Sequence, residues 1–222
     1  MTGIDTGVGK TYVGRILVKA LNKNGVSCIP RKPIETGCDL VNGEYQPEDA
    51  LLYFKTCNEQ YSLEEICPYR YEPPISPERA IRLVNQTVTV DDLANACQTN
   101  SNADVLYVEG AGGFYSPLCS NGLNADLAQK LNAEVILVVK DRLGCINQTL
   151  LTIEAIQNRN LNIKAIVLNQ YRQHEESAMD NLEDLRIRLS TPIVAIPNMI
   201  DATQDMLDTQ YQAIDELLDI LT

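Results

Sequence analysis

A glycine-rich segment at the start of the chain leads straight into a helical pattern, which leaves few folds open to the protein. The segment reads Gly3-Ile4-Asp5-Thr6-Gly7-Val8-Gly9-Lys10-Thr11. Glycines let a backbone curl so that successive N–H groups point at phosphate oxygens, and the N-terminus of the following helix adds a partial positive charge. The pattern therefore predicts a nucleotide-binding loop rather than an ordinary turn.

Two side chains of this segment have the chemistry that a bound triphosphate needs. Lys10 supplies a full positive charge for the β- and γ-phosphates, and the Thr11 hydroxyl can bind Mg²⁺. The spacing departs from the standard pattern, because five residues rather than four separate Gly3 from Gly9, and Ile4 stands where the first glycine is expected.

The rest of the chain alternates apolar runs with amphipathic segments, as in a mostly parallel sheet covered by helices. Predicted strands, nearly continuous in apolar character, span Val26–Ile34, Asp104–Glu109, Glu134–Lys140, Lys164–Asn169 and Pro192–Ile196. Predicted helices span Lys10–Lys23, Glu48–Thr56, Val90–Gln98, Ala125–Leu131, Ile146–Arg159, Glu176–Leu189 and Gln204–Leu221. These elements indicate a doubly wound α/β fold of the P-loop NTPase type, in a single domain over residues 1–222.

The first strand of such a sheet is nearly absent from the sequence. A phosphate-binding loop normally follows a strand, yet only Met1 and Thr2 precede Gly3. We therefore expect the sheet to contain an unfilled place beside the nucleotide site, which would leave the loop less firmly held.

Charged residues follow two predicted strands, at the edge where α/β proteins bind their ligands. Lys32 lies at the end of the first, before Glu35-Thr36-Gly37, and could stabilise charge on a transferring phosphoryl group or its acceptor. Glu109 ends the second and precedes Gly110-Ala111-Gly112-Gly113, while Asp49 begins a helix. Both acids are candidate magnesium ligands, because phosphoryl transfer needs hard oxygen donors beside the β- and γ-phosphates.

Two further positions stay open on the residues alone. Leu143-Gly144-Cys145-Ile146-Asn147 starts a helix whose free N–H groups could bind a carboxylate, although an ordinary strand-to-helix turn is favoured. Asn169 ends a predicted strand, and its amide either pairs with a purine edge or makes an Asx turn, of which the turn is favoured.

The composition argues against several classes of function. A net charge of −12 disfavours a nucleic-acid partner, since phosphate backbones attract lysine and arginine. The seven cysteines form no CxxC pair, which indicates inert thiols in a reducing compartment. The single histidine, His174, lies in a polar run and disfavours Ser–His–Asp hydrolysis. Without a long apolar stretch or a signal peptide, we expect a cytoplasmic protein with no membrane partner.

Taken together, these segments resemble dethiobiotin synthetase over nearly the whole chain. The likeness rests on the combination and order of Thr2–Thr11, Lys32–Gly37, Glu48–Ala50, Pro73–Pro77, Val108–Gly113, Leu143–Asn147 and Asn169. The resemblance implies a doubly wound α/β fold and a homodimer with a shared active site. It also implies that 7,8-diaminononanoate, CO₂ and ATP are converted, with Mg²⁺, to dethiobiotin, ADP and phosphate.

The resemblance further implies roles for individual residues. Thr11, Asp49 and Glu109 would hold Mg²⁺, and the catalytic Lys10 and Lys32 would neutralise charge on the γ-phosphate and the substrate carbamate. The residues expected around the nucleotide are Gly7, Val8, Gly9, Lys10, Thr11, Tyr12, Asp49, Glu109, Gly110, Ala111, Gly112, Asn169, Pro197, Asn198 and Met199. Those expected around the diamine are Thr6 and Thr36 and, across the dimer interface, Gly144, Cys145 and Asn147.

Two alternative functions remain. Another ATP-dependent amide ligase, such as a cobyrinate amidase, usually carries a further glutaminase domain, for which 222 residues leave no room. A nucleotide switch like the partition and septum-placement ATPases places a second lysine early in its loop, where this chain has Asp5. Asp5 and the negative charge count against the switch.

Overall fold

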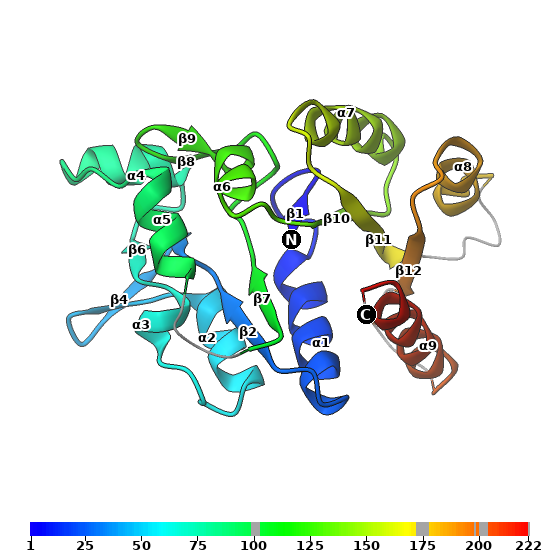
Figure 1. The fold of residues 1–222 in the computed structure, drawn as a ribbon, viewed down its shortest axis with the longest axis horizontal. Coiled ribbons are helices and arrows are strands. Elements are labelled where there is room, and N and C mark those ends of the chain that lie inside the picture. The colour runs from blue at the N-terminus through cyan, green and yellow to red at the C-terminus, as the bar shows by residue number, and fades with distance from the viewer. Residues whose placement is uncertain (99–102, 172–177, 198, 200–203, 222) are drawn as a thin grey trace.

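The computed structural model describes residues 1–98, 103–171, 178–197, 199 and 204–221, in which parallel strands lie between two layers of helices (Figure 1). The strands are β1 Thr2–Gly3, β2 Cys28–Arg31, β3 Ile34–Thr36, β4 Asp39–Val41, β5 Glu44–Gln46, β6 Tyr69–Tyr71, β7 Val105–Val108, β8 Pro117–Cys119, β9 Gly122–Leu123, β10 Val135–Lys140, β11 Ile163–Tyr171 and β12 Ile193–Pro197. The helices are α1 Lys10–Lys23, α2 Glu48–Thr56, α3 Leu63–Ile66, α4 Pro77–Leu83, α5 Val90–Cys97, α6 Asn124–Lys130, α7 Cys145–Asn158, α8 Asn181–Arg188 and α9 Gln204–Leu221.

The order of the central strands places a ligand-binding edge beside β1. Strands β1, β10, β11 and β12 pair in parallel in that order, and β2 pairs in parallel with β7. Met1 joins the two groups, because its amino group donates to Val108 O at 2.6 Å and its carbonyl accepts from Gly110 N at 3.2 Å. The chain therefore winds first to one side of β1 and later to the other. Such a switch point is where doubly wound folds bind ligands.

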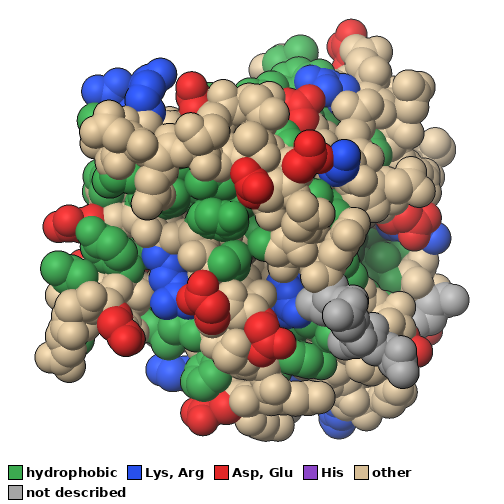
Figure 2. Space-filling view, turned by 60° about the vertical axis from the view of Figure 1, so that its left-hand side comes forward, with side chains coloured by type: hydrophobic (Ala, Val, Ile, Leu, Met, Phe, Trp, Pro, Cys, Tyr) green, Lys and Arg blue, Asp and Glu red, His purple; other side chains and the backbone are tan. Residues whose placement is uncertain are grey.

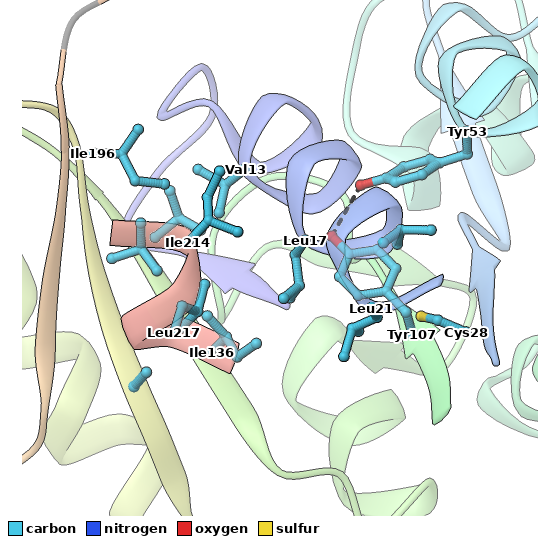
Figure 3. Close-up of a cluster of buried hydrophobic side chains, with 14 of the residues drawn as sticks. Val13, Leu17, Leu21, Cys28, Tyr53, Tyr107, Ile136, Ile196, Ile214 and Leu217 are labelled. Atoms are coloured by element: carbon cyan, nitrogen blue, oxygen red, sulfur yellow. Dashed lines mark hydrogen bonds between the residues drawn. The ribbon is translucent and has the colours of Figure 1, made fainter. Parts of the chain in front are cut away.

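Both faces of the sheet are buried, as the apolar strands predict. Leu137 and Leu168 face one core with α7 and α8, whereas Val138 and Val167 face another with α1 and α9. Figure 1 shows α7 and α8 at the top of the strands and α1 and α9 at the bottom. In Figure 3, side chains from α1 and α9 meet others from the sheet. The doubly wound α/β prediction is confirmed.

The predicted strand Val26–Ile34 is wrong, because the structure divides it into β2 and β3. Pro33 has no N–H to give to a neighbouring strand, and Lys32 N instead donates to Ile66 O at 2.8 Å. β3 then pairs with β6, a strand that the sequence did not predict. Lys32 thus lies in the break at the carboxyl end of β2.

The predicted helix Glu176–Leu189 is wrong at its start. Its described part becomes helical only at Asn181, and the Asp180 side chain caps α8 by accepting from Glu183 N at 3.0 Å. His174 and Glu176 lie outside the described residues. The helices predicted at Lys10–Lys23 and Gln204–Leu221 are confirmed with the same bounds.

The expected unfilled place in the sheet is present as a small cavity of about 50 Å³, whose lining includes Met1, Thr2, Val108 and Val135. Thr2 pairs with Leu137 and Gly3 with Val138, while Met1 bonds to β7 on the other side. Two strand residues therefore connect the sheet to the start of the loop, and the cavity lies beside them. In the described part of the chain, no helix is long and apolar enough to cross a membrane.

Gly14 lets α1 approach two tyrosines closely. A Cβ on Gly14 would lie 2.1 Å from the Tyr53 hydroxyl oxygen and 2.0 Å from that of Tyr107. On an open helix, glycine to alanine stabilises by about 1 kcal/mol. Here we expect Gly14→Ala to lower the free energy of unfolding by about 1–3 kcal/mol, measured by urea denaturation. Lys19→Ala, on an exposed position of α1, is the control, and an equally stable Gly14→Ala protein would contradict this packing.

Candidate active site

A cavity of about 400 Å³ opens at the carboxyl ends of β1, β2 and β7. It gathers segments that lie far apart in the sequence. Its lining is Thr6, Gly7, Gly9, Lys10, Thr11, Lys32, Glu35, Thr36, Asp49, Glu109, Ala111 and Gly112. The phosphate loop, the lysine after β2, the acid at the start of α2 and the acid after β7 therefore share one site.

The loop before α1 has the backbone that its glycines allow. Gly7 and Gly9 have φ of 70° and 90°, a region that other residues rarely adopt, and α1 follows Gly9 directly. Asn169 fixes the loop from β11, because its side-chain amide donates to Val8 O at 2.9 Å. A Cβ on Gly9 would lie 2.0 Å from that amide nitrogen, so only glycine fits there.

Lys10 begins α1 and is nearly buried, with 6% of its surface exposed. Its ammonium donates to Asp5 O at 3.3 Å. Burial and, to a smaller extent, the positive charge of Lys32 lower the pKa of Lys10 to about 8, against the effect of nearby carboxylates. Keeping the Lys10 ammonium charged at the N-terminus of α1 therefore lowers the stability of the folded protein.

Lys32 lies between the two predicted acids. Its Nζ is 2.6 Å from Glu109 Oε1 and 2.9 Å from Asp49 Oδ2, and the Thr11 hydroxyl donates to the same Glu109 oxygen at 2.9 Å. Burial opposes the charged form of Lys32, but Glu109 and Asp49 outweigh it and raise its pKa. Burial also opposes the charge of Asp49, yet Lys32 outweighs it and lowers the pKa of that carboxyl. Lys32 and Asp49 thus stabilise each other's charged form.

The oxygens at this point suit Mg²⁺. Thr11, Asp49 and Glu109 offer a hydroxyl and two carboxylates, the hard donors that magnesium prefers. No cluster of three or more His, Cys, Asp or Glu side chains capable of holding a metal occurs among the described residues. A magnesium ion here would therefore complete its coordination with phosphate oxygens and water, which is usual in nucleotide sites.

Glu35 is a site residue that the sequence did not single out. Its two carboxylate oxygens accept from Asp49 N at 2.8 Å and Ala50 N at 3.0 Å. Pro47, the residue before α2, has no side-chain acceptor, so Glu35 caps the helix from β3. Burial raises the pKa of Glu35 to about 7, against the effect of Lys32. In the sequence, Glu35 is only an acid within a short strand, and no pattern indicates that it contacts α2.

Several predicted residues lie outside the lining of this cavity. Gly144 and Asn147 are exposed and Cys145 is buried at the start of α7. The hydroxyl of Tyr12 contacts the Gln210 side chain of α9. The others outside the lining are Val8, Gly110, Asn169, Pro197 and Met199, while Asn198 lies outside the described residues.

Comparisons with known proteins agree with this geometry. Residues 1–206 match the model of a family described as an AAA domain. The chain is 42% identical over 170 residues to the ATP-dependent dethiobiotin synthetase BioD of Vesicomyosocius okutanii, covering 77% of each protein. It is 35% identical over 196 residues to that of Aeromonas salmonicida, covering 87% of each. The chain belongs to the dethiobiotin synthetase family.

Solved structures similar to this member of the dethiobiotin synthetase family are P-loop ATPases. The MinC:MinD cell division protein complex of Aquifex aeolicus has a TM-score of 0.56 at 17% identity, covering 96% of this chain and 84% of that one. A ParA family ATPase of Chlorobium tepidum has a TM-score of 0.54 at 13% identity, covering 98% and 90%. At such identities the likeness concerns the fold alone.

Replacing Lys10 should change the free energy of unfolding in a way that depends on pH. The unfolded chain, with an ordinary pKa of 10.5, holds this proton more tightly than the folded one, with a pKa of about 8. The cost of burying the charge is therefore full below pH 8 and disappears as the pH approaches 10.5. We expect Lys10→Met to raise the free energy of unfolding by about 1–3 kcal/mol at pH 7 and by less at pH 10.

Urea denaturation at both pH values measures this effect. Lys55→Met, at an exposed position of α2, is the control and should show no such dependence on pH. A Lys10→Met protein that is less stable than the wild type at pH 7 would refute a net cost of the buried ammonium.

Proposed function

We propose that the chain is an ATP-dependent dethiobiotin synthetase, which closes the cyclic urea of dethiobiotin from 7,8-diaminononanoate and CO₂ in biotin biosynthesis. The relatives that share 35–42% of its residues carry this name. The observation that carries the proposal is one cavity in which Lys10, Lys32, Thr11, Asp49 and Glu109 meet at a phosphate loop.

The reaction asks for charge and position rather than for a protein nucleophile. One amine of the substrate captures CO₂ as a carbamate and loses a proton. A carbamate oxygen attacks the γ-phosphorus of ATP, and the bond to ADP breaks. The second amine then attacks the carbonyl carbon of the mixed anhydride, expels phosphate and loses a proton as the ring closes. Alignment and electrostatic stabilisation are what phosphoryl transfer usually requires.

The two lysines supply the positive charge for these steps. Lys10, at the N-terminus of α1, neutralises the β- and γ-phosphates, which also receive N–H groups from Gly7–Tyr12 and Glu109–Gly112. Lys32, whose raised pKa keeps it protonated, stabilises the transferring phosphoryl group and the carbamate. Thr11, Asp49 and Glu109 would hold Mg²⁺, which when bound neutralises charge shared by the β- and γ-phosphates.

Residues at the rim of the cavity would contact the ends of the two substrates. Thr6 and Thr36 line the cavity, and we assign them to the diamine. Asn169, Pro197, Asn198 and Met199 would border adenine. In support of this, the buried Asn169 Oδ1 has no hydrogen-bond partner among the described residues and could accept from an amino group.

A homodimer with shared active sites is part of the proposal. The loop with Gly144, Cys145 and Asn147 does not line the cavity of its own chain, and Leu143 beside it is 90% exposed. We assign this loop to the distal carboxylate of the diamine bound in the partner's cavity.

We also infer a cytoplasmic location and small molecules, rather than nucleic acid or membrane, as partners. All seven cysteines are free and buried, which suits a reducing compartment. On the face shown in Figure 2, acidic and basic side chains are interspersed. The net charge of −12 would repel nucleic acid.

A coupled assay with purified protein tests the function. Phosphate release from Mg-ATP should require both 7,8-diaminononanoate and bicarbonate, since the carbamate is the acceptor. Lys32→Ala should lower turnover far more than it lowers ATP affinity measured by calorimetry, because its charge matters most during transfer. Exposed Lys55→Ala is the control. Equal ATP hydrolysis with and without the diamine would instead favour the nucleotide switch.

Mixing two inactive variants tests the shared site. Lys10→Ala damages the phosphate loop, and Asn147→Ala damages the loop assigned to the partner's site. If the sites are shared, a mixed dimer made by co-expression keeps one intact site and recovers roughly half the wild-type rate per dimer. If both residues serve the cavity of their own chain, each mixed dimer has one Lys10 defect and one Asn147 defect, and no activity returns.

A further inference from the structure

The two carboxylate oxygens of Glu109 have different neighbours. Oε1 accepts from Thr11 and Lys32 at the cavity, as described above. Oε2 accepts from the Tyr53 hydroxyl, which also shares a hydrogen bond of 2.9 Å with the hydroxyl of Tyr107. Glu109 and Tyr53 are 1% and 0% exposed. Tyr53, itself hydrogen-bonded to Tyr107, therefore holds the carboxylate oxygen of Glu109 that does not bond to Thr11 and Lys32.

The two tyrosine side chains are closely packed against each other and against α1. The two rings lie 5.5 Å apart and tilted by 48°, and Figure 3 shows their hydroxyls meeting beside α1. Gly14 provides the space at that point, since any larger residue would meet both oxygens. A buried phenol needs a hydrogen-bond partner, and here Glu109 and the second phenol satisfy the hydroxyl of Tyr53.

Helix α2 connects Tyr53 to the rest of the site. Asp49 and Tyr53 are four residues apart on α2, so they lie on the same face of the helix. Asp49 contacts Lys32, Tyr53 contacts Glu109, and Lys32 contacts Glu109. One helix face thus contacts both members of the buried Lys32–Glu109 ion pair.

We propose that Tyr53 is a positioning residue, whose hydroxyl holds Glu109 Oε2 so that Oε1 is presented to Thr11, Lys32 and the magnesium ion of the nucleotide. The terminal torsion of a glutamate is broad, so the carboxylate would turn more freely without this contact. Residues that orient a metal ligand typically change metal affinity by about 10–100-fold. The proposal rests on the proposed function for its activity measurement alone.

Tyr53→Phe and Tyr107→Phe form a matched pair for the test. Each removes one buried hydroxyl and keeps the ring, but only Tyr53 donates to Glu109. The Mg²⁺ requirement is measured twice, as the concentration giving half-maximal turnover and as the Mg²⁺ dependence of ADP binding by calorimetry. We expect about a tenfold rise for Tyr53→Phe in both measurements and less than a twofold change for Tyr107→Phe.

Urea denaturation of each variant checks that it is folded. The double variant Tyr53→Phe/Tyr107→Phe provides a second test. It removes both hydroxyls, so neither is left without the other, and its Mg²⁺ requirement should match that of Tyr53→Phe alone. The proposal is overturned if Tyr53→Phe and the double variant need no more Mg²⁺ than the wild type, or if Tyr107→Phe raises the requirement equally. A wild-type protein that makes no dethiobiotin would refute the proposed function, while the ADP measurement would still decide the role of Tyr53.

Discussion

An ammonium group buried between two carboxylates is the interaction on which the site depends. Lys32 is 4% exposed and contacts Glu109 and Asp49 at 2.6 and 2.9 Å. A buried ion without its partner costs several kcal/mol, so removing any one of these groups leaves the others uncompensated. Because Lys32 follows β2, Glu109 follows β7 and Asp49 starts α2, the same charges also hold three separate elements at one edge of the sheet.

The charges around the cavity favour a triphosphate that enters together with a cation, as the proposed function requires. Lys10 and Lys32 face Glu35, Asp49 and Glu109, so the lining carries no excess of positive charge. Coulomb repulsion in a partly buried site is strong, and a polyanion would bring further negative charge against these acids. The proposed magnesium ion resolves this conflict, since it lets carboxylates and phosphates share one positive centre.

Local patterns predicted those parts of the site that each depend on a single loop or strand end. The loop at Gly9-Lys10-Thr11 and the strand ends at Lys32 and Glu109 follow from glycine freedom and from the parallel sheet, and the structure brings them together. The Glu35 cap on α2 and the hydroxyl of Tyr53 were missed, because each depends on a partner in another element. The break between β2 and β3 was missed because the predicted strand Val26–Ile34 continues in sequence across Pro33, the residue that interrupts strand pairing.

The similarity to MinD and ParA proteins concerns the fold alone, so the chemistry of this chain has to be argued from its own residues. The fold supplies a phosphate loop at a switch point, and many functions use that arrangement. This chain has Asp5 in its loop and a second buried lysine, Lys32, directly after β2, where two acids rather than the loop itself hold it. A cation held in this way can act on whatever lies beyond the γ-phosphate. Phosphoryl transfer to an anionic acceptor such as a carbamate needs positive charge at that place.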